Sequence, residues 1–73
     1  MPNMNRVNAI VGPGDDGRYS VYVDNADYPY GIVGTGATAE DAVEDFRYGY
    51  REMKEYVEST GAAFVEAVFV FKM

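Results

Sequence analysis

Apolar and polar residues alternate along three stretches of this chain and recur with helical spacing along a fourth. The alternating stretches are 7–11, 18–24 and 63–71. Their β-branched and aromatic residues are typical of strands. Another strand is expected over 30–35, where Gly31 and Gly34 suggest that it bends or lies at an edge of the sheet. The segment 12–17 is rich in glycine and aspartate, which predicts a hairpin loop.

One long amphipathic helix is predicted over about 39–59. Thr38 is a suitable N-cap with Asp41 three residues on, and Gly61 is a suitable stop. At 100° per residue, one stripe collects Ala39, Ala42, Val43, Phe46, Tyr50, Met53 and Val57. A glycine inside a helix costs roughly 1 kcal/mol relative to alanine. We therefore expect Gly49 either to approach a strand closely or, as we favour, to lie in a crowded contact with tyrosine side chains.

The order of these elements predicts the fold class. It is α+β, a single βββαβ domain over residues 1–73, with a four-stranded sheet and one long helix packed on one face. The last strand is apolar on both faces, so we expect it to be central or covered on both sides. A single helix covers only one face, and we expect a second copy of the chain to bury the other. The residues of this self-association face are Ile10, Tyr22, Val68 and Val70.

Composition excludes several functional classes. The 73 residues include twelve acids and six bases, giving a net charge of −6, and neither cysteine nor histidine is present. Disulfides are therefore excluded, and binding to nucleic acid phosphates, which needs clustered Lys and Arg, is not expected. The sequence has no apolar run long enough for a signal peptide or a membrane span, so we expect a cytoplasmic protein.

No group of residues suggests catalysis or a cofactor. Nucleophilic catalysis and metal hydrolysis generally use His or Cys. Turn geometry explains four aspartates without a metal: Asp15, Asp16, Asp24 and Asp27. The run Gly34-Thr35-Gly36 precedes a helix but lacks the lysine of a phosphate-binding loop, which favours a plain turn. We expect no enzyme, no metal and no cofactor.

The outward face of the helix carries a candidate docking surface. One stripe, here called the acidic strip, contains Asp41, Glu44, Tyr48, Glu52 and Glu55. It could be an ordinary solvated face, with Arg51 pairing to Glu55 and Lys54 to Glu58. The exposed ring of Tyr48 favours a second interpretation, in which the strip binds a basic protein.

Two motifs give the chain a family resemblance. The first is Asp16-Gly17-Arg18-Tyr19-Ser20-Val21-Tyr22, and the second is Gly36-Ala37-Thr38-Ala39-Glu40-Asp41-Ala42. They resemble the D-G-x-Y strand start and G-x-T-x-E-E-A helix start of the HicB-like antitoxin family. The resemblance covers residues 7–71 and includes no C-terminal DNA-binding module. It implies a degraded RNase H-like domain without nuclease activity, which binds and masks a small basic toxin ribonuclease.

Two alternatives remain open from the sequence. The chain could be a stand-alone domain that assembles only with itself. It could instead bind a small ligand in a pocket between the helix and the loop at 24–30.

Overall fold

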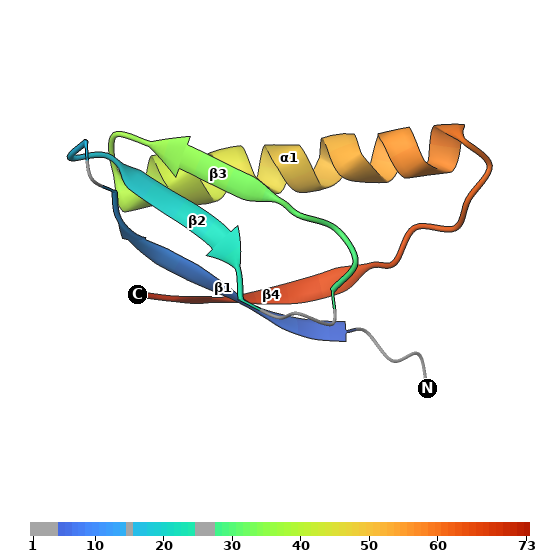
Figure 1. The fold of residues 1–73 in the computed structure, drawn as a ribbon, viewed down its shortest axis with the longest axis horizontal. Coiled ribbons are helices and arrows are strands. Elements are labelled where there is room, and N and C mark those ends of the chain that lie inside the picture. The colour runs from blue at the N-terminus through green and yellow to red at the C-terminus, as the bar shows by residue number, and fades with distance from the viewer. Residues whose placement is uncertain (1–4, 15, 25–27) are drawn as a thin grey trace.

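The computed structural model describes residues 5–14, 16–24 and 28–73, and it confirms the α+β fold. The elements follow the predicted order (Figure 1). They are β1 (Asn5–Pro13), β2 (Tyr19–Val23), β3 (Val33–Gly36), α1 (Ala39–Ser59) and β4 (Ala67–Lys72). The helix has the predicted limits, whereas β3 begins and ends later in the chain than expected.

The four strands form one mixed sheet in the order β3-β2-β1-β4. β1 pairs antiparallel with β2, β2 antiparallel with β3, and β4 lies parallel to β1. The edge position expected for the third strand is confirmed. The expectation that the last strand would be central is wrong, because β4 forms the opposite edge of the sheet. The apolar residues on both faces of β4 are therefore not explained by a position between two strands.

The inner face of the sheet carries the core. Val7, Ala9 and Val11 of β1 are buried, as the alternation predicts, and Val21 of β2 is fully buried beside them. The hairpin turn between these strands is also as predicted. Gly17 has a φ of 81°, and the Asp16 carboxylate accepts a hydrogen bond of 3.0 Å from the Arg18 N–H. Aspartate and glycine therefore fix the turn through local backbone contacts.

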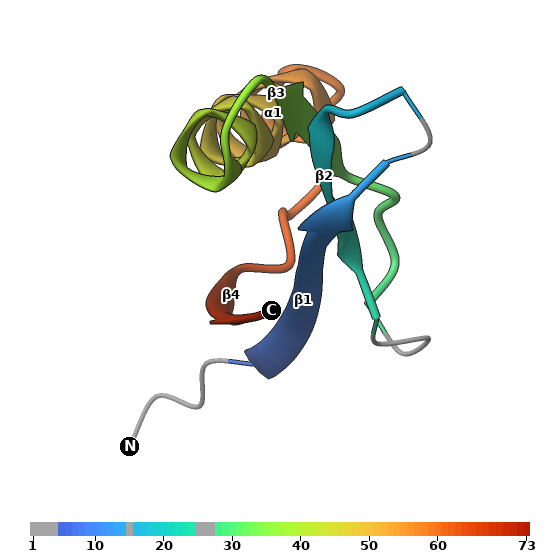
Figure 2. The ribbon, with the colours of Figure 1, turned by 90° about the vertical axis from the view of Figure 1, so that its left-hand side faces the viewer.

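α1 lies over β3 and β2, away from the backbone of β4 (Figure 2). Thr38 caps its N-terminus by accepting the Asp41 N–H at 3.1 Å, and Gly61 with a φ of 86° follows its C-terminus. Ala42 and Phe46 are the residues of α1 that are fully buried against the sheet. The predicted apolar stripe is thus confirmed as the face that packs on the sheet.

The close approach between helix and sheet occurs at the glycines of β3. A Cβ on Gly36 would stand 2.7 Å from the Ala42 nitrogen, and one on Gly34 would overlap the helix backbone at Phe46. Real Cβ atoms do not come so near, so both glycines are required by packing. At Gly49 the expectation of crowding is wrong, because a Cβ there would meet Ile32 at an ordinary 3.4 Å.

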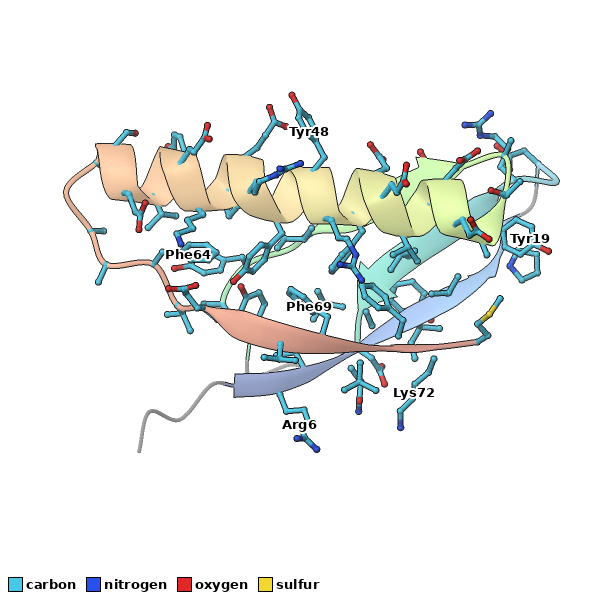
Figure 3. The ribbon with its side chains drawn as sticks, turned by 180° about the vertical axis from the view of Figure 1, so that it is seen from behind. Arg6, Tyr19, Tyr48, Phe64, Phe69 and Lys72 are labelled. Atoms are coloured by element: carbon cyan, nitrogen blue, oxygen red, sulfur yellow. The ribbon has the colours of Figure 1, made fainter. Side chains whose placement is uncertain are left out.

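Aromatic rings fill the space between α1 and β4. Phe69 points from β4 toward the helix (Figure 3). Its ring lies 4.9 Å from Phe46, 5.2 Å from Tyr50 and 5.7 Å from Tyr28, each in an edge-to-face arrangement. This is the favourable geometry for aromatic pairs.

The residues before β4 are held by tyrosines instead of by β1. The Tyr28 hydroxyl donates to the Val65 carbonyl at 3.0 Å, and the Val65 N–H donates to the Tyr30 hydroxyl at 3.1 Å. Pairing with β1 starts only at Asn5 with Ala67. The predicted strand over 63–71 is therefore wrong in its first four residues, which precede β4 and of which Val65 is bonded to tyrosine hydroxyls.

Candidate functional site

The acidic strip is an exposed surface on the side of α1 that faces away from the sheet. All five of its members are exposed: Asp41, Glu44, Tyr48, Glu52 and Glu55. The side chain of Tyr48 is 54% exposed and points away from the sheet (Figure 3). Helical spacing thus brings the predicted residues onto one surface.

Tyr48 and the glutamates of the strip interact electrostatically. The negative charge of Glu52, with a smaller contribution from Glu55, raises the pKa of the Tyr48 phenol, and Arg51 opposes this effect. The raised pKa keeps the phenol uncharged, so a partner that brought positive charge to the strip would offset the repulsion among its carboxylates.

The basic residues beside the strip do not pair along the helix as expected. Lys54 forms an ion pair of 3.5 Å with Glu66, which precedes β4. It is the one ion pair in the described part of the chain, so the predicted pairs Lys54–Glu58 and Arg51–Glu55 are not formed. The carboxylates of the strip consequently have no cationic partner among the described residues.

The outer face of the sheet holds the residues predicted for self-association. Ile10 lies directly opposite Tyr22, whereas Val68 lies beside Arg6 and Val70 beside Asn8. Tyr22, Val68 and Val70 are 48%, 47% and 37% exposed, and Ile10 is half-buried. The structure brings these four side chains onto one face, on which Arg6 and Asn8 lie directly beside the two valines and Lys72 lies beside Ile10.

Val33 belongs to the same face and was missed by the sequence prediction. It is 62% exposed and lies opposite Tyr22 on β3. An apolar row therefore crosses three strands through Val33, Tyr22 and Ile10. The sequence does contain a signal for this position, because Val33 points outward where Gly34 points inward. The glycines of this segment made the start of the strand hard to locate.

Comparison of the chain with protein-family models, curated proteins and solved structures finds no match. The resemblance to HicB-like antitoxins consequently rests on the two motifs alone. Both have structural roles here, because Asp16 and Gly17 form the hairpin turn and Thr38 caps the helix.

A groove lies between α1 and β4. One hollow of about 500 Å³ is lined by Val11, Ala39, Glu40, Val43, Glu44, Arg47, Phe71 and Met73. A second, of about 370 Å³, is lined by Arg47, Tyr50, Ala67, Val68, Phe69 and Phe71. The Arg47 guanidinium lies 5.3 Å from the centre of the Phe71 ring, in a cation–π contact. Arg47 thus lines both parts of the groove.

The ligand pocket expected between the helix and the loop at 24–30 falls partly outside the described residues, which leave out 25–27, and neither hollow of the groove is lined by residue 24 or 28–30. A hollow of about 460 Å³ lies elsewhere, beside the hairpin turn, and is lined by Gly14, Asp16, Arg18, Tyr19, Ser20 and Thr35.

The aspartates considered as metal ligands are described only in part, since Asp15 and Asp27 lie outside the described residues. Within the described part, no three acidic side chains converge as metal ligands would. Within the same part, no helix combines the length and apolar character needed to cross a membrane.

Proposed function

We propose that the chain is a non-enzymatic, cytoplasmic binding domain that holds a small basic protein on the acidic strip of α1. The observation that carries this proposal is the exposure of four carboxylates around the Tyr48 ring, with no cation paired to them among the described residues. A ring surrounded by like charges combines an apolar contact with long-range attraction for a basic surface.

The resemblance to HicB-like antitoxins supports a more specific partner, a small basic toxin ribonuclease that the chain would mask. Binding through the strip would be electrostatic in large part. Its affinity should therefore fall as the salt concentration rises. A masked ribonuclease would regain activity on RNA when salt or a competing polycation displaces it.

The test compares two variants of equal net charge. The double variant Glu44→Lys/Glu52→Lys reverses the strip, and Glu40→Lys/Glu58→Lys makes the same charge change at exposed positions outside it. Each tagged chain is incubated with lysate of the host, and bound proteins are identified by mass spectrometry and assayed for RNA cleavage. A small basic protein retained by wild type and control, but lost from the strip variant, would support the proposal. Equal retention by all three chains would refute it.

A second candidate function is self-assembly through the outer face of the sheet. The row of Val33, Tyr22 and Ile10, two of whose side chains are about half exposed or more, favours it. The variant Tyr22→Lys tests it, because a charge in the middle of a buried face should abolish association in sedimentation experiments.

A further inference from the structure

The charge on the four strands is small and entirely positive. Arg6 of β1 and Lys72 of β4 are the charged residues among the strand residues that the structure describes. Both are exposed, and both side chains lie on the side of the sheet opposite to α1 (Figure 3). Arg6 pairs with Val68 and Lys72 with Ile10, which places the two cations on the outer face among its apolar side chains. The outer face is therefore an apolar surface with two cations and no strand acid.

The opposite side of the molecule has the opposite charge. α1 has more acids than bases, and its acidic strip is exposed. Tyr48 points from the middle of that strip away from the sheet (Figure 3). Each surface also exposes apolar groups, the ring of Tyr48 on the strip and the side chains of Val68 and Val70 on the sheet. The two surfaces of one chain thus complement each other in charge.

The spacing of the charges on the two surfaces also agrees. Lys72 lies beside the residue four positions after Arg6 on β1. At roughly 3.3 Å per residue, this places the two cations about 13 Å apart along the sheet. Glu44 and Glu52 are eight residues apart on α1, which corresponds to about 12 Å at the helical rise of roughly 1.5 Å per residue. One pair of carboxylates can therefore reach both cations at once.

We propose that the acidic strip of one copy of the chain docks on the outer sheet face of a second copy. Glu44 and Glu52 of the first copy meet the two cations of the second. The Tyr48 ring, midway between the carboxylates, then lies over Val70, which pairs with Asn8 midway between the cations. Because the two surfaces differ, each copy keeps one of them open. Assembly therefore continues to a ring or a filament.

Charge favours this arrangement over the stacking of two sheet faces. Sheet-on-sheet stacking would bring Arg6 and Lys72 of both copies into one interface, and no strand residue supplies an acid to offset them. Like charges placed together in an interface oppose association. A second copy that presents α1 instead supplies carboxylates of the required sign and spacing.

This assembly uses the acidic strip but does not rest on the basic partner proposed above, so its test uses the purified chain alone. The variant Glu44→Gln/Glu52→Gln neutralises the strip and keeps the sheet face, whereas Arg6→Gln/Lys72→Gln does the reverse. Each alone should associate about tenfold more weakly than the wild type in sedimentation velocity. Mixed, they offer one intact strip and one intact sheet face. Native mass spectrometry, with one variant isotope-labelled, should show a one-to-one pair that grows no further.

Two comparisons separate this assembly from other effects. Glu40→Gln/Glu58→Gln removes two exposed acids of α1 outside the strip and should assemble as the wild type does. Arg6→Gln/Lys72→Gln keeps the strip and should still retain the basic protein of the proposed function from host lysate. Loss of self-assembly and loss of partner binding are therefore measured separately.

Three results would overturn the proposal. Association of Glu44→Gln/Glu52→Gln at wild-type strength would show that the sheet faces stack on each other. A wild-type chain that stays monomeric up to millimolar concentration would exclude the assembly. A mixture of the two neutralised variants without a one-to-one pair would show that strip and sheet face do not meet.

Discussion

Gly34 of β3 lies directly against the backbone of Phe46 in α1. A Cβ built on Gly34 would stand 2.7 Å from the Phe46 Cα, a distance that real Cβ atoms do not reach. Phe46 is itself fully buried, and its ring packs edge-to-face against Phe69 of β4. One missing methyl group thus allows the helix to come near enough to the sheet for its central aromatic ring to reach the opposite edge strand.

Replacing Gly34 by alanine should therefore separate helix and sheet. We expect Gly34→Ala to lower the free energy of unfolding by about 3 kcal/mol or more, because the added carbon meets backbone that cannot rotate away. Urea denaturation monitored by circular dichroism measures the change. Gly49→Ala is the control, because a Cβ there makes an ordinary contact and alanine favours the helix. It should raise stability by about 0.5–1 kcal/mol. The prediction is that the two substitutions change the free energy of unfolding in opposite directions. Equal losses of stability would contradict it.

Tyr28 should make stability depend on alkaline pH. Its ring is buried, its hydroxyl donates to the Val65 carbonyl, and burial is the main cause that raises the pKa of its phenol above the ordinary value of 10.0. A phenol whose pKa is higher in the folded chain than in the unfolded chain makes its full contribution to stability at pH values below the unfolded pKa. This contribution is lost as the pH rises above about 10.

The variant Tyr28→Phe isolates that contribution. At pH 8 it should cost about 1 kcal/mol for the lost hydrogen bond. Between pH 9 and 11, its free energy of unfolding should fall less steeply than that of the wild type. Urea denaturation at several pH values measures both effects. Tyr56→Phe removes a phenol that is 68% exposed, and it should leave the wild-type slope unchanged. Parallel slopes for wild type and Tyr28→Phe would show that Tyr28 does not titrate differently on folding.

Local patterns were sufficient to predict the helix but not the edges of the sheet. Thr38 and Gly61 marked the ends of α1 because capping depends on neighbouring residues only. The start of β4 depends on where β1 begins and on hydroxyls that come from Tyr28, Tyr30 and Tyr50. Such contacts between distant segments leave no local signal. The predicted strand therefore begins at residue 63, four residues before β4 itself.

The candidate surfaces were predictable where a single element builds them. The acidic strip follows from the helical period, and the outward position of Tyr22 follows from alternation in β2. The partner of Lys54 was missed because Glu66 comes from the approach to β4, twelve residues further on. The reason for Gly34 was missed in the same way. A glycine in a strand has several explanations, and only the packed helix distinguishes between them.

Asp45 provides a test of the protection at the β3 edge. Its carboxylate accepts the Thr35 N–H at 2.9 Å, which occupies a backbone donor that would otherwise face solvent or another strand. We expect Asp45→Ala to accelerate exchange of the Thr35 amide, and to increase concentration-dependent aggregation.

The stability change of Asp45→Ala alone is ambiguous, because alanine's higher helix propensity offsets part of a loss of about 1 kcal/mol. Amide exchange measured by NMR at Thr35 is therefore the decisive reading. Asp45→Asn retains an oxygen that can accept the same N–H, and it should keep most of the protection. Thr35→Ala leaves the backbone bond in place and should change little. Equal exchange at position 35 in wild type and Asp45→Ala would mean that the edge is protected by its twist against α1 and not by the carboxylate.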